Sequence, residues 1–360
     1  ITMNILKINI VGLALLTLLM GGTAVAQKPK NVIFIVGDGM GTAQVYSSIV
    51  AKGEGSQFLR FPVTGFSRTY CLDRYTTDSG AGGTALMTGH KVNYHAIALS
   101  PEGVEWPSFL KVAHDEMGKK TGIVVTCSPL DATPASTYGH VPERSQWDTL
   151  SMQMAQCCHD VIIGGDRKSF QPKHRKDGKA PIDTLERRGY TMVYSQDDLY
   201  AQDATRLCAL LTDDWDAGNA EKRNNWLAPS AEKAINILNR NEQGFVMMIE
   251  GSQIDWACHA NNFDAMLMEL NEFELMLAKV LDFAEKDGNT LVVVTADHET
   301  GGLTLNKGDI DAHETTEHHY TTTNHTGVMV PVFAYGPGAE RFAGIQQNTD
   351  FFNKILDLLR

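Results

Sequence analysis

Four short runs of apolar residues, separated by stretches with helical periodicity, constrain the fold of this chain most strongly. The runs are residues 31–36, 122–126, 245–249 and 290–295. Short, continuously apolar runs that end in polar clusters are typical of strands buried on both faces of a parallel sheet. Three intervening stretches have apolar residues three and four positions apart, which predicts helices. They are residues 106–119, 229–239 and 263–286.

The alternation of strand and helix predicts an α/β fold with a doubly wound, mostly parallel central sheet and helices on both faces. In such sheets, ligands bind beyond the carboxyl ends of the strands. The polar clusters that follow the apolar runs are therefore the first places to search for a functional site.

The N-terminal segment has the features of a cleavable secretory signal. Lys7 precedes an apolar run over residues 8–20, and the segment ends in Ala24-Val25-Ala26. A membrane anchor is the weaker interpretation, because a bilayer requires about 20 apolar residues. We expect residues 1–26 to be removed after Ala26, leaving residues 27–360 as the catalytic domain of a periplasmic or secreted protein without a membrane anchor.

The net charge of −12 argues against a basic surface for nucleic acid. An anionic substrate must then be attracted by local positive charge, either from metal ions or from a well-placed arginine. Six cysteines in an exported chain leave disulfide pairing open. The absence of a Cys-x-x-Cys pair makes a thiolate zinc site a poor explanation for them.

Acidic residues and histidines follow three of the apolar runs. Asp38 lies in a Gly-Asp-Gly-Met-Gly segment, where a helix-capping carboxylate is at least as good an interpretation as a metal ligand. Asp255 and His259 are one helical turn apart and can face one cation, although surface pairs use the same spacing. Asp297 and His298 form a second acid–imidazole pair directly after a buried strand.

His325, in a His-Thr-Gly segment, is a further candidate ligand. His313, His318 and His319 compete with it, and nothing in the local sequence excludes them.

Ser79 is the candidate nucleophile. It begins a stretch of small residues, Ser79-Gly-Ala-Gly-Gly-Thr-Ala, in which a helix start would place its hydroxyl near backbone N–H groups. A helix-capping serine is the competing interpretation. The segment lacks the Gly-x-Ser-x-Gly pattern of acyl-transfer enzymes, so activation by a metal is the favoured route.

Oxygen ligands and an arginine follow the run at residues 122–126. Asp131 and Thr133 supply a carboxylate and a hydroxyl, the hard oxygens that suit magnesium, and Glu250 stands at the end of the run at residues 245–249. Arg144 supplies a planar fork that matches two phosphate oxygens. The segment Cys-Ser-Pro-Leu-Asp ending at Asp131 is not a sulfatase signature, because that signature needs arginine at the last position.

From residue 31 to the C-terminus, the chain resembles the alkaline phosphatase family through these five motifs in the expected order. The resemblance implies hydrolysis of small phosphate monoesters to an alcohol and inorganic phosphate, through a phosphoserine at Ser79. It also implies two Zn²⁺ and one Mg²⁺. By resemblance, the magnesium ligands are Asp38, Thr133 and Glu250. The ligands of the first zinc are Asp255, His259 and His325. The ligands of the second zinc are Asp38, Asp297 and His298. Arg144 matches the phosphate-binding arginine, and the His-Thr-Gly context selects His325 over its competitors.

Two features depart from the family pattern. Trp256 stands where the best-known members have lysine or histidine near the phosphate, and the region around 164–226 matches poorly, as an insertion would. The family also suggests a homodimer. A phosphodiesterase or sulfatase of the same superfamily, and an inactive metal-binding or phosphate-scavenging protein, are the alternative functions.

Overall fold

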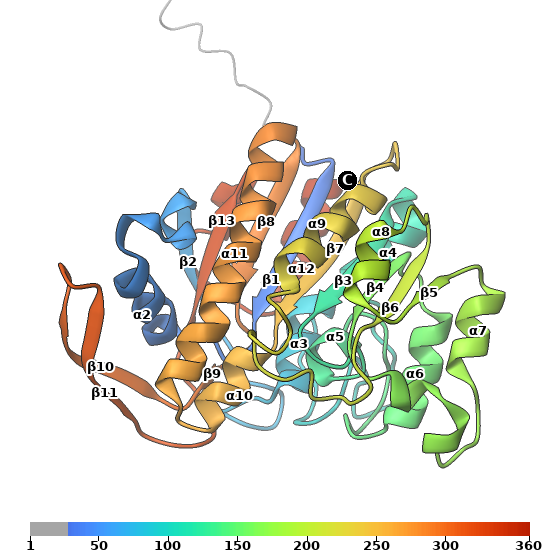
Figure 1. The fold of residues 1–360 in the computed structure, drawn as a ribbon, viewed down its shortest axis with the longest axis horizontal. Helices are drawn as coiled ribbons and strands as arrows, with labels where there is room; N and C mark the ends of the chain where they lie inside the picture. Colours follow the sequence, from blue (N-terminus) through green and yellow to red (C-terminus); the bar gives the residue numbers. More distant parts are fainter. Residues whose placement is uncertain (1–27) are drawn as a thin grey trace, which may run out of the picture.

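A central sheet of ten strands with helices on both faces organises the protein (Figure 1). This computed structural model describes residues 28–360, so the predicted signal at residues 1–26 lies outside the described residues. The strand order is β14-β2-β13-β8-β1-β7-β3-β4-β6-β5. These strands are β1 (Asn31–Gly37), β2 (Val63–Arg68), β3 (Lys120–Val125), β4 (Val161–Gly164), β5 (Thr191–Val193), β6 (Leu207–Leu210), β7 (Phe245–Gly251), β8 (Thr290–Thr295), β13 (Val330–Tyr335) and β14 (Gly344–Gln347).

The α-helices connect these strands across both faces. They are α2 (Thr42–Lys52), α3 (Ser79–Thr88), α4 (Phe109–Met117), α5 (Ala132–Ala135), α6 (Trp147–Gln156), α7 (Pro181–Arg187), α8 (Gln196–Ala201), α9 (Leu227–Leu238), α10 (Gln253–His259), α11 (Phe263–Asp287) and α12 (Asp350–Leu359). Short 3₁₀ segments are η1 (Gly53–Gly55), η2 (Gln57–Arg60), η3 (Arg167–Phe170), η4 (Pro172–His174) and η5 (Ala339–Phe342).

The seven strands from β8 to β5 in this order are mutually parallel, whereas β13 runs antiparallel to both β8 and β2. The carboxyl ends of β8, β1, β7 and β3 therefore lie side by side along one edge of the sheet, the edge formed by the strand ends and not by an outermost strand. In Figure 1 this is the lower edge, where α10, α3 and α5 also lie.

The side chains of β1 alternate between the two faces of the central sheet, and each face has its own part of the hydrophobic core. Ile33 and Ile35 pack into a cluster with residues of α2, α9, α10 and α11, whereas Val32 and Phe34 pack with α3, α4, α6 and α12. A strand that is apolar at every position is therefore buried on both sides, as the sequence predicts.

The structure confirms the predicted fold class, and the four predicted strands correspond to β1, β3, β7 and β8. The region 164–226 continues this sheet, because it contributes β6 and β5 beyond β4. These strands have only four and three residues, too few for their apolar pattern to stand out in the sequence.

Two small sheets lie outside the central one. One is the hairpin of β10 (Leu303–Asp309) and β11 (Glu314–Tyr320), and the other pairs β9 (Glu299–Thr300) with β12 (His325–Thr326). The second pairing places His325 opposite Thr300, close to the end of β8.

No helix within the described residues is long and apolar enough to cross a membrane. All six cysteines are free thiols, so none of the pairings that the sequence leaves open is formed here.

Candidate metal centre and active site

Three neighbouring parallel strands deliver carboxylates to one place. Asp38 directly follows β1, Glu250 is the penultimate residue of β7, and Asp297 lies two residues after β8. Glu250 is in register with Val36 of β1 and with Val125 of β3. The side chains converge because β7, β1 and β8 are adjacent and end at the same edge.

Asp38, Asp297 and His298 form the first cluster, and their ligand atoms lie within 4.8 Å of one another. Nε2 of His298 is 3.5 Å from Oδ1 of Asp38 and 3.2 Å from Oδ2 of Asp297. Burial and then repulsion from neighbouring carboxylates raise the pKa of Asp38 well above its ordinary value, and burial raises that of Asp297 to about 7. Crowded buried carboxylates of this kind favour a cation between them.

Asp255, His259 and His325 form the second cluster. Oxygen atoms of Asp255 lie 3.3 Å from Nε2 of His259 and 3.6 Å from Nε2 of His325. The two Nε2 atoms are themselves 3.1 Å apart. The hydrogen bond with Asp255 raises the pKa of His259 to about 9, whereas burial lowers the pKa of His325.

Backbone carbonyls hold the outer nitrogen of both imidazoles. Nδ1 of His259 is 2.6 Å from the carbonyl oxygen of Thr323, and Nδ1 of His325 is 2.9 Å from that of Thr77. A carbonyl can only accept, so each Nδ1 carries a hydrogen and each Nε2 is directed toward Asp255. Two Nε2 atoms this close require a proton or a metal ion between them, and this tautomer is the one found in metal-ligating histidines.

Thr133 and Glu250 add oxygen atoms on the other side of Asp38. The Thr133 hydroxyl lies 3.3 Å from Oδ2 of Asp38 and 3.5 Å from Oδ2 of Asp297. Burial, followed by repulsion from Asp131 and Asp297, raises the pKa of Glu250 well above its ordinary value. The group is rich in hard oxygens and poor in nitrogens, which suits Mg²⁺ better than Zn²⁺.

Ser79 is the first residue of α3, but it does not cap that helix. Asp78 is the cap, since its carboxylate accepts hydrogen bonds from the backbone N–H groups of Gly80 and Ala81. The hydroxyl oxygen of Ser79 is instead 3.2 Å from Nε2 of His298. The structure thus excludes the helix-capping interpretation and directs this hydroxyl at the first cluster.

Arg144 is held as a fork between two carboxylates. Nη1 donates to Asp78 over 3.1 Å and Nη2 donates to Asp131 over 2.9 Å. Burial works in the opposite direction, but the charges of Asp131 and Asp78 raise the pKa of Arg144 above its ordinary value. A guanidinium oriented in this way is ready to bind a tetrahedral anion in pairs of hydrogen bonds.

Sequence reasoning missed two orienting groups. Asp78 positions Arg144, and Thr300 donates a hydrogen bond to Asp255 while its hydroxyl lies 3.2 Å from Nδ1 of His298. Both residues were visible as neighbours of candidate residues. The Asp78–Arg144 and Thr300–Asp255 contacts join positions 66 and 45 residues apart, which no local pattern signals.

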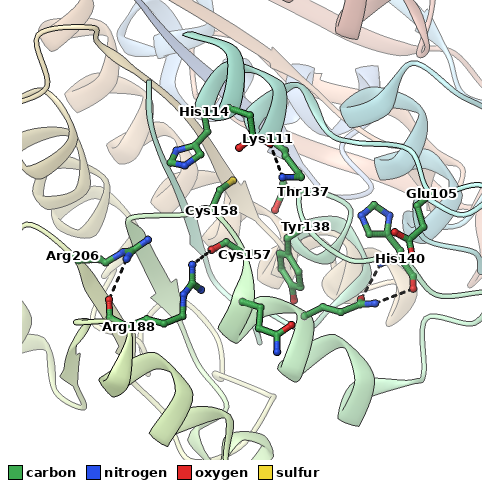
Figure 2. A pocket seen from close by; sticks show the side chains of 13 residues that line it. Glu105, Lys111, His114, Thr137, Tyr138, His140, Cys157, Cys158, Arg188 and Arg206 are labelled. Carbon is green, nitrogen blue, oxygen red and sulfur yellow. Dashed lines mark hydrogen bonds and ion pairs between the residues drawn. The ribbon is translucent and has the colours of Figure 1, made fainter. Parts of the chain in front are cut away.

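A cavity of about 420 Å³ opens beside the second cluster and is lined by Arg74, Thr76, Tyr94, His259, Asn324 and His325. A second cavity of about 430 Å³, beside Cys157 and Cys158, contains none of the candidate residues (Figure 2). The two cavities have nearly the same volume, so volume does not identify the active site. The candidate ligands His259 and His325 line the cavity beside the second cluster, and we therefore assign the active site to that cavity.

Two acid–imidazole clusters, one of them fully buried, beside a serine hydroxyl and a forked arginine define the class of metal-dependent hydrolases that act on phosphate esters. Comparison with known proteins narrows this class. The alkaline phosphatase family model matches residues 29–316. The chain therefore belongs to the alkaline phosphatase family, whose members depend on metal ions, and it is a phosphomonoesterase.

Individual relatives agree. Alkaline phosphatase 4 of Bacillus subtilis is 30% identical, with 92% of this chain and 89% of the relative covered. The alkaline phosphatase of Escherichia coli is 29% identical over 91% of this chain and 86% of its own. The solved alkaline phosphatase of the Antarctic bacterium TAB5 superimposes with a TM-score of 0.85 at 34% identity, covering 93% of this chain and 98% of its own. A mutant of that enzyme has Mg bound in its M3 site.

The family-model match stops at residue 316, before His325. The choice of His325 over His313, His318 and His319 is therefore supported separately. Among the described residues, His325 is the one of these four that lies in a group able to hold a metal ion.

Proposed function

We propose that this protein is an exported alkaline phosphatase that hydrolyses phosphate monoesters through a phosphoserine at Ser79, with two Zn²⁺ and one Mg²⁺ at the clusters described above. The observation that carries the proposal is the 3.2 Å contact between the Ser79 hydroxyl and His298 within the first cluster. It puts a hydroxyl that takes no part in capping α3 beside ligands suited to zinc.

The residues present fit this set of metals. Asp38 Oδ1 is buried without a hydrogen bond, and the Nε2 atoms of His259 and His325 face each other at 3.1 Å. We assign the second cluster, which consists of Asp255, His259 and His325, to the first zinc. The first cluster, which consists of Asp38, Asp297 and His298, is assigned to the second zinc. Asp38, Thr133 and Glu250 are assigned to magnesium. When bound, these ions supply positive charge against the phosphoryl oxygens and make hydroxyl groups and water more acidic.

The protein groups have separate parts in the reaction. Arg144 binds two non-bridging oxygens of the phosphoryl group, with Asp78 and Asp131 holding its fork in plane. Ser79 Oγ gives up its proton to solvent and attacks phosphorus, a P–O bond to Ser79 forms, the bond to the leaving alcohol breaks, and the alcohol oxygen takes up a proton from solvent. Water then attacks the phosphoserine from the side that the alcohol has left, which releases inorganic phosphate and restores Ser79.

The proposal includes processing and quaternary structure. We propose that residues 1–26 direct export to the periplasm or medium, that residues 27–360 form the catalytic domain with an insertion around 164–226, and that two chains form a dimer. Mass spectrometry of secreted protein, with Gln27 expected as the first residue, and light scattering check these points.

Turnover of p-nitrophenyl phosphate by the protein with zinc and magnesium, compared with bis-p-nitrophenyl phosphate and p-nitrophenyl sulfate, tests the reaction. The proposal expects the monoester to be preferred, because a dianionic phosphate would offer Arg144 and the bound metal ions one more charged oxygen. Preference for the diester or the sulfate would replace it with the related activities, and no turnover at all would favour a non-catalytic metal-binding protein.

A further inference from the structure

Three tryptophans from separate parts of the chain contact one another. The rings of Trp215 and Trp256 have centroids 4.8 Å apart, and those of Trp147 and Trp215 lie 6.1 Å apart. Both distances fall in the range of favourable aromatic contacts. The three side chains therefore form one continuous aromatic surface, which we call the tryptophan wall.

The two ends of the wall are close in sequence to residues of the candidate active site. Trp256 directly follows Asp255 on α10, and Trp147 opens α6 three residues after Arg144. Asp255 belongs to the second cluster, and Arg144 is the proposed phosphate ligand. The tryptophan wall thus connects α10, which carries a candidate metal ligand, with the start of α6, which follows the arginine proposed to bind the phosphoryl group.

The middle residue is supplied by the region 164–226. Trp215 lies in the loop after β6, whose carboxyl end is at the same edge of the sheet as the site. Backbone N–H groups of Arg167 and Lys168 donate to the carbonyl oxygens of Thr212 and Asp213 over 2.8 and 3.0 Å. A loop tied down in this way presents its indole in a defined position.

The wall is open to solvent. Trp215 is 45% exposed and Trp147 is 38% exposed, whereas Trp226, a tryptophan that serves the core, is 1% exposed. Exposing two adjoining indoles is unfavourable in water, and such surfaces commonly mark binding sites for apolar groups. No residue within residues 28–360 covers the faces of Trp147 and Trp215 enough to bury them.

We propose that the tryptophan wall binds the leaving group of the substrate and selects phosphate monoesters whose leaving group contains a planar aromatic ring, such as aryl phosphates and nucleoside monophosphates. The proposal rests on the proposed function of the neighbouring site. An aromatic ring joined to the phosphoryl group can stack on an exposed indole, whereas a glycerol or sugar-alcohol group has no π-face to do so.

The test compares three monoesters: p-nitrophenyl phosphate, adenosine 5′-monophosphate and glycerol 2-phosphate. For each enzyme, kcat/KM of a ring-bearing ester is divided by kcat/KM of glycerol 2-phosphate. In Trp215→Ala we expect this ratio to fall about tenfold, a typical effect of losing one stacking partner. Trp215→Phe keeps a π-face and should retain most of the ratio.

The matched control is Tyr200→Ala. Tyr200 is a partly exposed aromatic residue (37%) on α8, a helix that packs against α9 (Figure 1). Inhibition by inorganic phosphate provides a second control, because phosphate has no leaving group. The inhibition constant of Trp215→Ala should match that of the wild type.

If the ratio falls only for adenosine 5′-monophosphate, the ring that the wall binds is a nucleobase. If the ratio falls only for p-nitrophenyl phosphate, the ring that the wall binds is an aryl group on the reacting oxygen. The proposal is overturned if the ratio is unchanged, or if all three esters and the phosphate inhibition constant shift together. Failure of the proposed function looks different, because the wild-type enzyme would then hydrolyse none of the three esters.

Discussion

Replacing Asp297 with asparagine should stabilise the chelated protein at pH 8 while removing its activity. Asp297 is fully buried, and burial raises its pKa from 3.8 to about 7. Between these two values the unfolded chain releases the proton and the folded chain keeps it. The free energy of unfolding therefore falls as pH rises toward 7, and the loss is complete above it.

The magnitude follows from that shift. From pH 5 to the folded pKa of about 7 is about two units, and each unit is worth about 1.4 kcal/mol, so Asp297 costs roughly 3 kcal/mol more at pH 8 than at pH 5. Asparagine has no charge to bury. Its side-chain oxygen can still accept from Gly39 N and His298 N, the two backbone groups that donate to Asp297 Oδ1.

The assay is urea unfolding of wild-type and Asp297→Asn protein, both treated with a chelator, at pH 5 and pH 8. The contributions of titrating groups that do not interact with Asp297 cancel in the difference between the two proteins. Asp297 repels Asp38 and Glu250, so removing its charge lowers their pKa values and moves the difference in the same direction, in favour of the variant at high pH. We expect the difference in unfolding free energy to move by roughly 3 kcal/mol in favour of the variant between the two pH values. A difference that is the same at both pH values, or that moves in favour of the wild type, would show that the pKa of Asp297 is not raised in the folded protein.

Two further substitutions test the other groups of the site. His325→Ala should lower the zinc content by about one ion per chain, measured by plasma mass spectrometry. The control is His319→Ala, at an exposed histidine that the sequence alone did not exclude, and it should keep the full zinc content. Equal loss of zinc in both variants would argue against a metal site at the second cluster. Arg144→Ala should lower kcat/KM for p-nitrophenyl phosphate about 100-fold or more and weaken inhibition by inorganic phosphate. Arg144→Lys should have values between those of the wild type and the alanine variant. Unchanged phosphate inhibition would show that Arg144 does not bind the phosphoryl group.

Much of the central sheet could be predicted from the sequence because β1, β3, β7 and β8 are buried on both faces. Their uniform apolar character is visible without any partner strand. Strands β5 and β6 were not predicted, since three or four residues are too few to distinguish a strand from a loop. Their place in the sheet depends on pairing with β4, which is a non-local contact.

The candidate site shows the same division. Asp255 and His259 could be paired from their spacing alone, because a helical turn brings positions i and i+4 together. His325 could not be chosen locally, since its position depends on the pairing of β12 with β9. Ser79 had two interpretations, and only the capping contacts of Asp78 across the start of α3 separate them.

The central claim is that Ser79 carries the phosphoryl group during turnover. Acid quenching of the enzyme with zinc and magnesium during hydrolysis of p-nitrophenyl phosphate, followed by peptide mapping by mass spectrometry, tests it most directly. We expect one phosphoryl group on the peptide that contains Ser79, with neither this modification nor appreciable turnover in Ser79→Ala. An active enzyme with no phosphorylated Ser79 peptide, or a Ser79→Ala variant that turns over at the wild-type rate, would contradict it.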